Sequence, residues 1–242
     1  MVLTDNKLVV IIPAYEPQPD FIEYALKVSP LVAHLVVVND GSSEAYDDVF
    51  GKISMLPNCT YLKHDINRGK GCALKTAFDY CIKNFSRDAI LVTADCDGQH
   101  AIEDVLRVYE AALANKNSLV LGSRDFTKDN IPPKSQFGNS LFRVAYRVVY
   151  GLAIYDTQTG LRGFSIPLAE VFLSLPGDRF EYEMTMLICA KQDKIPILEV
   201  PIQTIYQKPE ERITHYKAFR DTAIIMHTVI KNARKIKKSK TK

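Results

Sequence analysis

Short runs of aliphatic and β-branched residues alternate with longer amphipathic stretches through the first half of this chain. The runs are predicted to be strands at residues 8–13, 35–39, 60–64, 89–94 and 118–123, and the stretches between them to be helices at 20–28, 45–55, 71–84 and 102–115. The first three runs are almost continuously apolar, which is typical of strands that helices cover on both faces. This alternation predicts an α/β fold with a mostly parallel sheet and right-handed crossovers.

The pattern changes after Arg124, where residues 125–136 contain two prolines and mixed charges and are predicted to be a loop. Further expectations are helices at 137–150, 167–174 and 180–190, a strand at 161–165, one or two strands at 195–206 interrupted at Pro201, and an amphipathic helix at about 217–237. No repeat or low-complexity linker divides the chain. We expect one domain at residues 1–216, followed by a basic amphipathic helix and tail at 217–242.

Composition narrows the class of protein. Hydrophobic residues make up 47% of the 242 and charged residues 24%, which excludes a disordered or fibrous chain. The net charge of +3 is too small for wholesale nucleic-acid binding, so no nucleic-acid partner is expected. From Lys231 onward, seven Lys or Arg residues occur without an acidic residue, so this tail is predicted to contact an anionic surface.

Five cysteines occur at irregular spacing without a CxxC pair, which favours reduced thiols in a cytoplasmic protein. The apolar run at residues 8–12 is far shorter than the core of an export signal. No stretch approaches the roughly 18 apolar residues of a membrane span. We therefore expect a cytoplasmic protein without a spanning segment.

Four polar clusters follow the first four predicted strands. They are Pro13-Ala14-Tyr15-Glu16, Asn39-Asp40-Gly41-Ser42-Ser43, Asn67-Arg68-Gly69-Lys70-Gly71 and Asp95-Cys96-Asp97-Gly98-Gln99-His100. The carboxyl ends of strands are where open α/β sheets bind ligands. The convergence of four clusters on one edge predicts a single ligand site there.

The most specific of these clusters holds two carboxylates, Asp95 and Asp97, directly after an apolar run. A turn at Gly98 would bring both near one cation. Hard oxygen ligands suit Mg²⁺ or Mn²⁺, and few protein ligands leave room for a diphosphate. The alternative interpretation is a strand-end turn followed by a helix cap.

The other clusters are less specific. Asp40 would bind a base or ribose, or would only close an Asx turn. Arg68 and Lys70 at a helix start would hold phosphate, or would only form a surface turn. The chain has no GxGxxG after the first strand, no GxxxxGK[ST] loop, no HExxH and no GxSxG, which argues against a dinucleotide cofactor, a P-loop, zinc and a serine nucleophile.

In this order the clusters resemble the family-two glycosyltransferases, most of all the branch of dolichol-phosphate mannosyltransferases and bacterial polyprenyl-phosphate glycosyltransferases. The similarity runs from about Leu8 to Asp221. Later matching segments are Gly122-Ser123-Arg124, the run from Asp156 to Arg162, Phe180-Glu181-Tyr182-Glu183-Met184 and Glu199-Val200-Pro201-Ile202. The resemblance implies a GT-A fold, a Rossmann-like, mostly parallel sheet flanked by helices, with a C-terminal amphipathic helix.

The resemblance also implies a nucleotide-sugar donor, UDP-linked rather than GDP-linked, and an inverting displacement at the anomeric carbon. The residues that would bind the donor are Pro13, Ala14, Tyr15, Glu16, Asp40, Arg68, Lys70, Asp95 and His215. Asp95, Asp97 and Gln99 would hold Mg²⁺ or Mn²⁺ against the diphosphate.

The acceptor decides whether a general base is needed. A polyprenyl phosphate is largely ionised at pH 7, because its second pKa is about 6, and it attacks without a base. The candidates for binding that phosphate are Arg124 first, then Lys134, Arg143 and Arg162. A hydroxyl acceptor would need a carboxylate base, for which Asp156 and Glu183 are candidates, unless they form a helix cap and an ion pair. The candidate catalytic residues are therefore Asp97, Arg124, Asp156 and Glu183.

The sequence departs from the family pattern at three points. Asn39 stands where an acidic residue is usual, and Gln136 stands where relatives often carry an arginine before Phe-Gly-Asn. The transmembrane helices of many relatives are missing. Thr214-His215-Tyr216 resembles the Ser-His-Phe of bacterial relatives, a loop expected to close over the donor.

Three functions follow from these observations. The leading one is sugar transfer to undecaprenyl phosphate for cell-surface glycan synthesis, at the inner face of the cell membrane. The second is transfer to a hydroxyl of a glycan or lipid-linked oligosaccharide, and the third is a non-catalytic nucleotide-sugar-binding module. The basic helix at 217–237 predicts peripheral membrane contact, its alternative being a helix packed on the core. A small membrane-protein partner and a homo-oligomer are both compatible with the chain.

Overall fold

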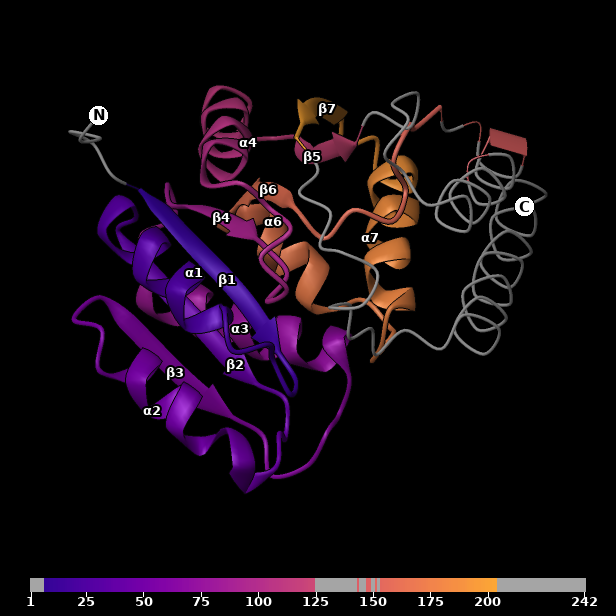
Figure 1. Cartoon of the computed structure of the whole chain (residues 1–242). Helices are drawn as coiled ribbons and strands as arrows, with labels where there is room; N and C mark the ends of the chain where they lie inside the picture. Colours follow the sequence, from indigo (N-terminus) through magenta and orange to yellow (C-terminus); the bar gives the residue numbers. More distant parts are fainter. Residues whose placement is uncertain (1–6, 125–142, 144–146, 149–150, 152, 204–242) are drawn as a thin grey trace.

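The computed structural model describes residues 7–124, 143, 147–148, 151 and 153–203 (Figure 1). These residues form one seven-stranded sheet of order β3-β2-β1-β4-β6-β5-β7. The strands are β1 (Leu8–Ala14), β2 (His34–Asn39), β3 (Cys59–Lys63), β4 (Ile90–Thr93), β5 (Leu119–Arg124), β6 (Arg162–Ser165) and β7 (Ile197–Ile202). In Figure 1, β3 lies at one end of the sheet and β7 at the other.

The direction of the strands fixes where the polar clusters lie. The pairs β1·β2, β2·β3, β1·β4 and β5·β7 are parallel, whereas β6 is antiparallel to both β4 and β5. Two successive reversals leave β5 running in the same direction as β4. The carboxyl ends of six strands therefore share one edge of the sheet.

Helices cover both faces of the sheet. Their bounds are α1 (Phe21–Val28), α2 (Asp47–Ser54), α3 (Lys70–Asn84), α4 (Ile102–Ala114), α6 (Ile166–Leu173) and α7 (Glu181–Gln192), with 3₁₀ turns at Ser29–Leu31 and Glu44–Tyr46. Buried residues of α1, α2 and α4 join one apolar cluster, and those of α3, α6 and α7 join the other. Successive residues of β1 alternate between the two clusters, because side chains of a strand alternate between the faces of its sheet.

The mostly parallel sheet flanked by helices is confirmed. The predicted interruption at Pro201 is wrong, because β7 runs unbroken through this residue and pairs it with Ser123. Proline is tolerated here because β7 is an edge strand, whose outer side has no ladder bond to lose. The predicted helix at 137–150 is described only at residues 143, 147 and 148, all helical, and the predicted helix at 217–237 lies outside the described residues.

Two further observations concern the described part of the chain. None of its helices combines the length and the apolar character that crossing a membrane requires. All five cysteines carry free thiols, and burial raises the pKa of Cys59 to about 11.

Candidate active site

The ends of β1 and β2 are joined by hydrogen bonds. The Asp40 N–H donates to the Ala14 carbonyl at 2.8 Å, and the Glu16 N–H donates to the Ser42 hydroxyl at 2.9 Å. Pro13 lies opposite Val38 in the parallel register. The predicted donor residues Pro13, Ala14, Tyr15 and Glu16 therefore lie beside Asp40, as one wall of the site.

Asp40 organises the start of α3. Its buried carboxylate accepts the Arg68 N–H at 3.0 Å and the Gly69 N–H at 2.7 Å, and it contacts His64 Nδ1 at 2.7 Å. The turn after β2 is closed instead by the Asn39 side chain, which accepts the Ser42 N–H at 2.8 Å. Asp40 therefore does not close the local turn. Its carboxylate instead fixes the backbone of the loop that carries Arg68 and Lys70.

Lys70 and His100 both contact Asp95. Lys70 Nζ lies 2.7 Å from one carboxylate oxygen of Asp95, and His100 Nε2 lies 3.3 Å from the other. Burial by itself would raise the pKa of Asp95, but the positive charge of Lys70 and the contact with His100 outweigh it and hold that pKa below its ordinary value. Asp95 is therefore ionised in the neutral pH range.

Asp97 lies close enough to Asp95 for the two charges to interact. Burial, and then the negative charge of Asp95, raises the pKa of Asp97. Gly98 has a φ of 67°, a left-handed conformation that glycine adopts readily, and the Gln99 N–H donates to Asp97 at 3.1 Å. The predicted turn at Gly98 is present.

These residues fit a hard divalent cation with few protein ligands. Two repelling carboxylates and the amide of Gln99 supply oxygen donors, which Mg²⁺ and Mn²⁺ prefer. No group of three or more His, Cys, Asp or Glu side chains suited to holding a metal occurs among the residues that the structure describes. The remaining positions around a cation would therefore fall to other ligands, such as a diphosphate.

Gly160 lies directly against Asp95. A Cβ added at this glycine would fall inside van der Waals contact of both carboxylate oxygens. The Gly160 carbonyl accepts the Thr93 hydroxyl at 2.8 Å, which ties it to the end of β4. Four residues earlier in the same segment, Asp156 lies within about 14 Å of Gly160, because an extended residue spans at most about 3.6 Å.

Asp156 pairs with Arg124 at the end of β5. Arg124 Nε and Nη2 donate to its two oxygens at 2.5 and 3.0 Å, and Asp156 is fully buried. Glu199 accepts the N–H groups of Tyr155 and Asp156 at 2.9 and 3.2 Å. The guanidinium of Arg143 stacks 5.0 Å from the ring centre of Tyr155. Two of the predicted phosphate-binding cations, Arg124 and Arg143, thus contact neighbouring residues of one segment, Asp156 and Tyr155.

Arg162 and Glu183 are placed differently from their predicted roles. Arg162 is 1% exposed and donates to the carbonyls of Thr159 and Glu183 at 3.0 and 2.6 Å, so an acceptor phosphate would reach it only after rearrangement. The Glu183 carboxylate is buried and lies 2.9 Å from Lys70 Nζ. Glu183 is therefore a buried partner of Lys70, and Arg162 is a buried donor to the Glu183 carbonyl.

Two predicted residues, Lys134 and His215, lie outside the described part of the chain. Four residues that contact the site were given no role from sequence: His64, His100, Gly160 and Glu199. Gly160 and Glu199 fall in segments that match the family motifs, but their partners, Asp95 and the 155–156 backbone, lie far away in sequence. His64 gave no signal of its own beyond its place three residues before the Asn-Arg-Gly-Lys-Gly cluster.

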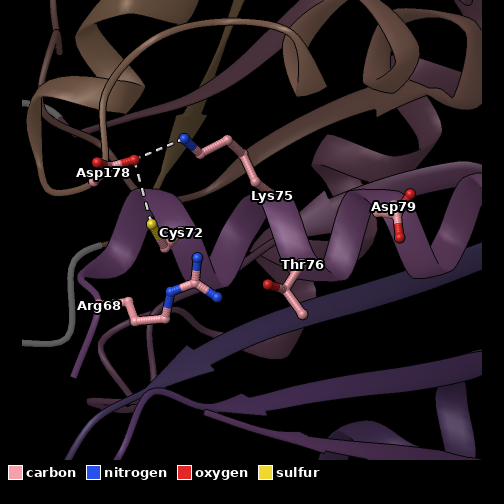
Figure 2. A pocket seen from close by; sticks show the side chains of 6 residues that line it. All are labelled: Arg68, Cys72, Lys75, Thr76, Asp79 and Asp178. Carbon is pink, nitrogen blue, oxygen red and sulfur yellow. Dashed lines mark hydrogen bonds and ion pairs between the residues drawn. The ribbon is translucent and has the colours of Figure 1, made fainter. Parts of the chain in front are cut away.

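A cavity of about 350 Å³ opens on the outer side of α3 (Figure 2). It is lined by Arg68, Cys72, Lys75, Thr76, Asp79 and Asp178. Lys75 Nζ lies 2.8 Å from Asp178 across the cavity. The lining contains neither Asp95 nor Asp97, so this cavity is not the predicted metal and diphosphate site.

Several known proteins are similar to this chain in sequence or in fold. The chain is 32% identical over 196 residues to an uncharacterized protein of Methanocaldococcus jannaschii, covering 79% of this chain and 75% of that protein. It is 29% identical over 250 residues to a UDP-N-acetylglucosamine–dolichyl-phosphate N-acetylglucosaminyltransferase of Methanococcus voltae, covering 93% of each.

Among solved structures, glucosyl-3-phosphoglycerate synthase of Mycobacterium tuberculosis, in complex with Mn²⁺, UDP and phosphoglyceric acid, is similar with a TM-score of 0.70. The similarity covers 95% of this chain and 79% of that one at 16% identity, so it supports the fold alone. Residues 9–171 match the sequence pattern of glycosyl transferase family 2. The chain therefore belongs to glycosyl transferase family 2.

Proposed function

We propose that this protein transfers a sugar from a nucleotide-sugar, UDP-linked, to a polyprenyl phosphate with inversion at the anomeric carbon. The observation that carries the proposal is the segment from Asp156 to Gly160. It joins Arg124, an anion-binding side chain, to Asp95 of the predicted metal and diphosphate site at one edge of the sheet. A cationic acceptor subsite beside a donor diphosphate subsite is what such a reaction needs.

The donor half of the site is built from the ends of β1, β2 and β4. Asp95, Asp97 and Gln99 would hold a divalent cation, which offsets the charge that develops on the departing nucleoside diphosphate. Lys70 is charged and lies 2.7 Å from Asp95, within reach of the same diphosphate. The archaeal relative that is named for a UDP-sugar donor matches 93% of this chain, which supports UDP over GDP.

The acceptor half favours a phosphate over a hydroxyl. A phosphate oxygen that is already ionised attacks the anomeric carbon while the bond from that carbon to the diphosphate breaks, and no proton has to be removed. A hydroxyl would need a base, but Asp156 is fully buried with both oxygens held by Arg124, and Glu183 is buried against Lys70. Neither carboxylate is placed to accept a proton from a substrate.

Arg124 and Arg143 are the described cations that we assign to the acceptor phosphate. Asp156 and Glu199 position them: Asp156 fixes the Arg124 guanidinium, and Glu199 fixes the backbone of Tyr155, on whose ring Arg143 stacks. Lys134 completes the proposed set, and His215 belongs to the proposed donor loop. Residues 217–242 are proposed to bring this site to a membrane surface, at the inner face of the cell membrane.

A transfer assay tests the proposal. Purified protein is incubated with Mg²⁺ or Mn²⁺, undecaprenyl or dolichyl phosphate, and radiolabelled UDP- or GDP-sugars, and the lipid is extracted into organic solvent. We expect label in the organic phase with a UDP-sugar and its loss in excess chelator. Full transfer in chelator would refute the metal role, and sugar–sugar product without lipid label would show a hydroxyl acceptor.

The residue assignments have their own controls. Arg124→Gln should abolish transfer to the lipid phosphate while UDP binding stays within about twofold of wild type, because Arg124 is assigned to the acceptor alone. Asp79→Asn removes an exposed carboxylate that pairs with Lys83 on the outer side of α3, and it should leave transfer unchanged. Loss of UDP binding in Arg124→Gln would place this arginine in the donor subsite instead.

A further inference from the structure

Lys70 places a positive charge beside Asp95. Its ammonium lies 2.7 Å from Asp95 and 2.9 Å from Glu183, and its side chain is 17% exposed. These two carboxylates use two of the three N–H groups of the ammonium. No partner for the third occurs among the residues that the structure describes.

Asp95 has little freedom to turn away from Lys70. One of its oxygens contacts Lys70 and the other contacts His100, and Gly160 packs against the carboxylate. A divalent cation that binds Asp95 must therefore share or take an oxygen that already has a partner, and for one of the two oxygens that partner is the Lys70 ammonium. Like charges held this close repel strongly in a partly buried site.

An anion bound at the start of α3 would offer the Lys70 ammonium another partner. It is the first residue of α3, where the backbone N–H groups and the helix dipole favour an anion. Its flexible four-carbon stem allows the ammonium to move by a few ångströms. Glu183, buried behind it, keeps the ammonium near the site whether or not it contacts Asp95.

We propose that Lys70 competes with the divalent cation for Asp95 and yields it only when a diphosphate arrives to receive the ammonium. This inference rests on the proposed function, because it takes the diphosphate of a nucleotide-sugar as the ligand that releases Lys70. Its consequence is ordered loading: the cation binds weakly to the protein alone and tightly together with the nucleotide. Lys70 thus links metal affinity to donor binding, and Glu183 is its positioning residue.

The experiment measures Mn²⁺ binding to the full chain from the electron paramagnetic resonance signal of free Mn²⁺, without and with UDP. For Lys70→Met we expect Mn²⁺ affinity without UDP to rise about 10-fold, because a repelling charge is removed. We expect UDP affinity at saturating Mn²⁺ to fall about 10-fold in the same variant. A merely structural role for Lys70 would lower both affinities.

Two variants serve as controls. Lys75→Met removes a lysine one turn further along α3, which pairs with Asp178 in the cavity of Figure 2 and not with Asp95, and it should change neither affinity by more than about twofold. Lys70→Arg keeps the charge and should keep the weak Mn²⁺ binding of wild type. If Lys70→Met does not fold, Lys70→Gln is used, whose neutral amide still donates a hydrogen bond to a carboxylate.

The outcomes separate this inference from the proposed function. If Mn²⁺ binds Lys70→Met or Lys70→Gln no more tightly than it binds wild type, the proposed competition is overturned, whatever the transfer assay gives. If wild type shows no Mn²⁺ binding, gain of binding in Lys70→Met supports the inference, and continued absence overturns it. Absence of lipid transfer by wild type refutes the proposed function, while the Mn²⁺ titration still judges Lys70.

Discussion

At the scale of single residues, Asp95 and Asp97 carry opposite shifts although they are two positions apart. Lys70 and His100 hold the pKa of Asp95 down against its burial, whereas burial and the charge of Asp95 raise the pKa of Asp97. Nearby positive charge therefore favours the ionised form of Asp95, whereas burial disfavours that of Asp97. An added positive charge would favour the ionised form of Asp97 as well.

Asp97→Asn is expected to lower transfer on the order of 100-fold, because it removes a charged ligand from the reacting diphosphate. The same change should raise the Tm of the metal-free protein. A carboxyl with a raised folded pKa gives stability that is lost as the pH rises through that pKa. Asparagine cannot ionise, so the variant avoids the cost of the buried Asp97 charge. The gain in Tm should therefore be present at pH 7 and vanish at low pH, where Asp97 itself is protonated. Scanning calorimetry measures the Tm at each pH. An unchanged transfer rate, or a lower Tm at pH 7, would contradict the assignment.

Gly160→Ala is expected to abolish metal-dependent transfer while the fold is kept. The added methyl group would overlap the Asp95 carboxylate, which must then move away from its place beside Lys70. Gly51→Ala is the matched control, because nothing lies near its added Cβ in α2. It should keep activity and gain roughly 0.5–1 kcal/mol from helix propensity. Circular dichroism and the transfer assay together check both variants, and full activity of Gly160→Ala would mean that Asp95 tolerates displacement.

At the scale of elements, helix α7 supplies Glu183, the buried partner of Lys70. Most of its buried residues belong to the same apolar cluster as those of α3 and α6, and Glu183 on its first turn contacts Lys70 at 2.9 Å. Tyr182, the preceding residue, donates its hydroxyl to the Phe172 carbonyl near the end of α6 at 2.7 Å and is fully buried. This bond fastens the start of α7 to α6, so it also sets where Glu183 lies.

Tyr182→Phe is expected to destabilise the protein by about 1 kcal/mol, because one buried hydrogen bond to the Phe172 carbonyl is lost, while that carbonyl still accepts the Leu175 N–H at 3.0 Å. For a chain of this size that corresponds to a fall in Tm of about 2–4 °C. Urea unfolding should show a lower midpoint with an unchanged slope. A Tm equal to that of wild type would mean that the Leu175 N–H alone satisfies the Phe172 carbonyl.

At the scale of the whole molecule, charge is distributed unevenly. Seven basic residues and no acidic ones follow position 230, while the rest of the chain has a net charge of −4. An anionic membrane surface attracts a basic segment by about 1 kcal/mol for each Lys or Arg near it. This is the physical basis of the proposed membrane contact.

Replacing Lys235, Lys237, Lys238 and Lys240 by Gln should weaken binding to vesicles that contain anionic lipid by at least about 10-fold. Binding of wild type should itself weaken as salt rises, because exposed charges are screened. Vesicle sedimentation measures both. The matched control replaces four lysines that lie before the basic tail, and it should have little effect on vesicle binding. These are Lys27, Lys52, Lys63 and Lys83. Equal loss in the two variants would contradict a specific role for the tail.

Much of the fold and of the candidate site follows from local sequence. Apolar runs and amphipathic stretches specify strands and helices one by one, and the clusters after β1, β2, β3 and β4 meet because parallel strands share one carboxyl edge. The turn at Gly98 that brings Asp95 and Asp97 together is equally local. These features depend on residues within a few positions of one another, which is why the sequence was enough for them.

Only the tertiary structure decided the contacts that give the residues their roles. The antiparallel strand β6 lies between β4 and β5 and directly follows the segment that joins Arg124 to Asp95. The burial of Arg162 and the reach of Lys70 to Glu183, 113 positions away, are likewise absent from any local pattern. Local propensities determine which elements form. Which side chains meet across them depends on strand order, register and helix packing, and those are set by the burial of the whole core at once.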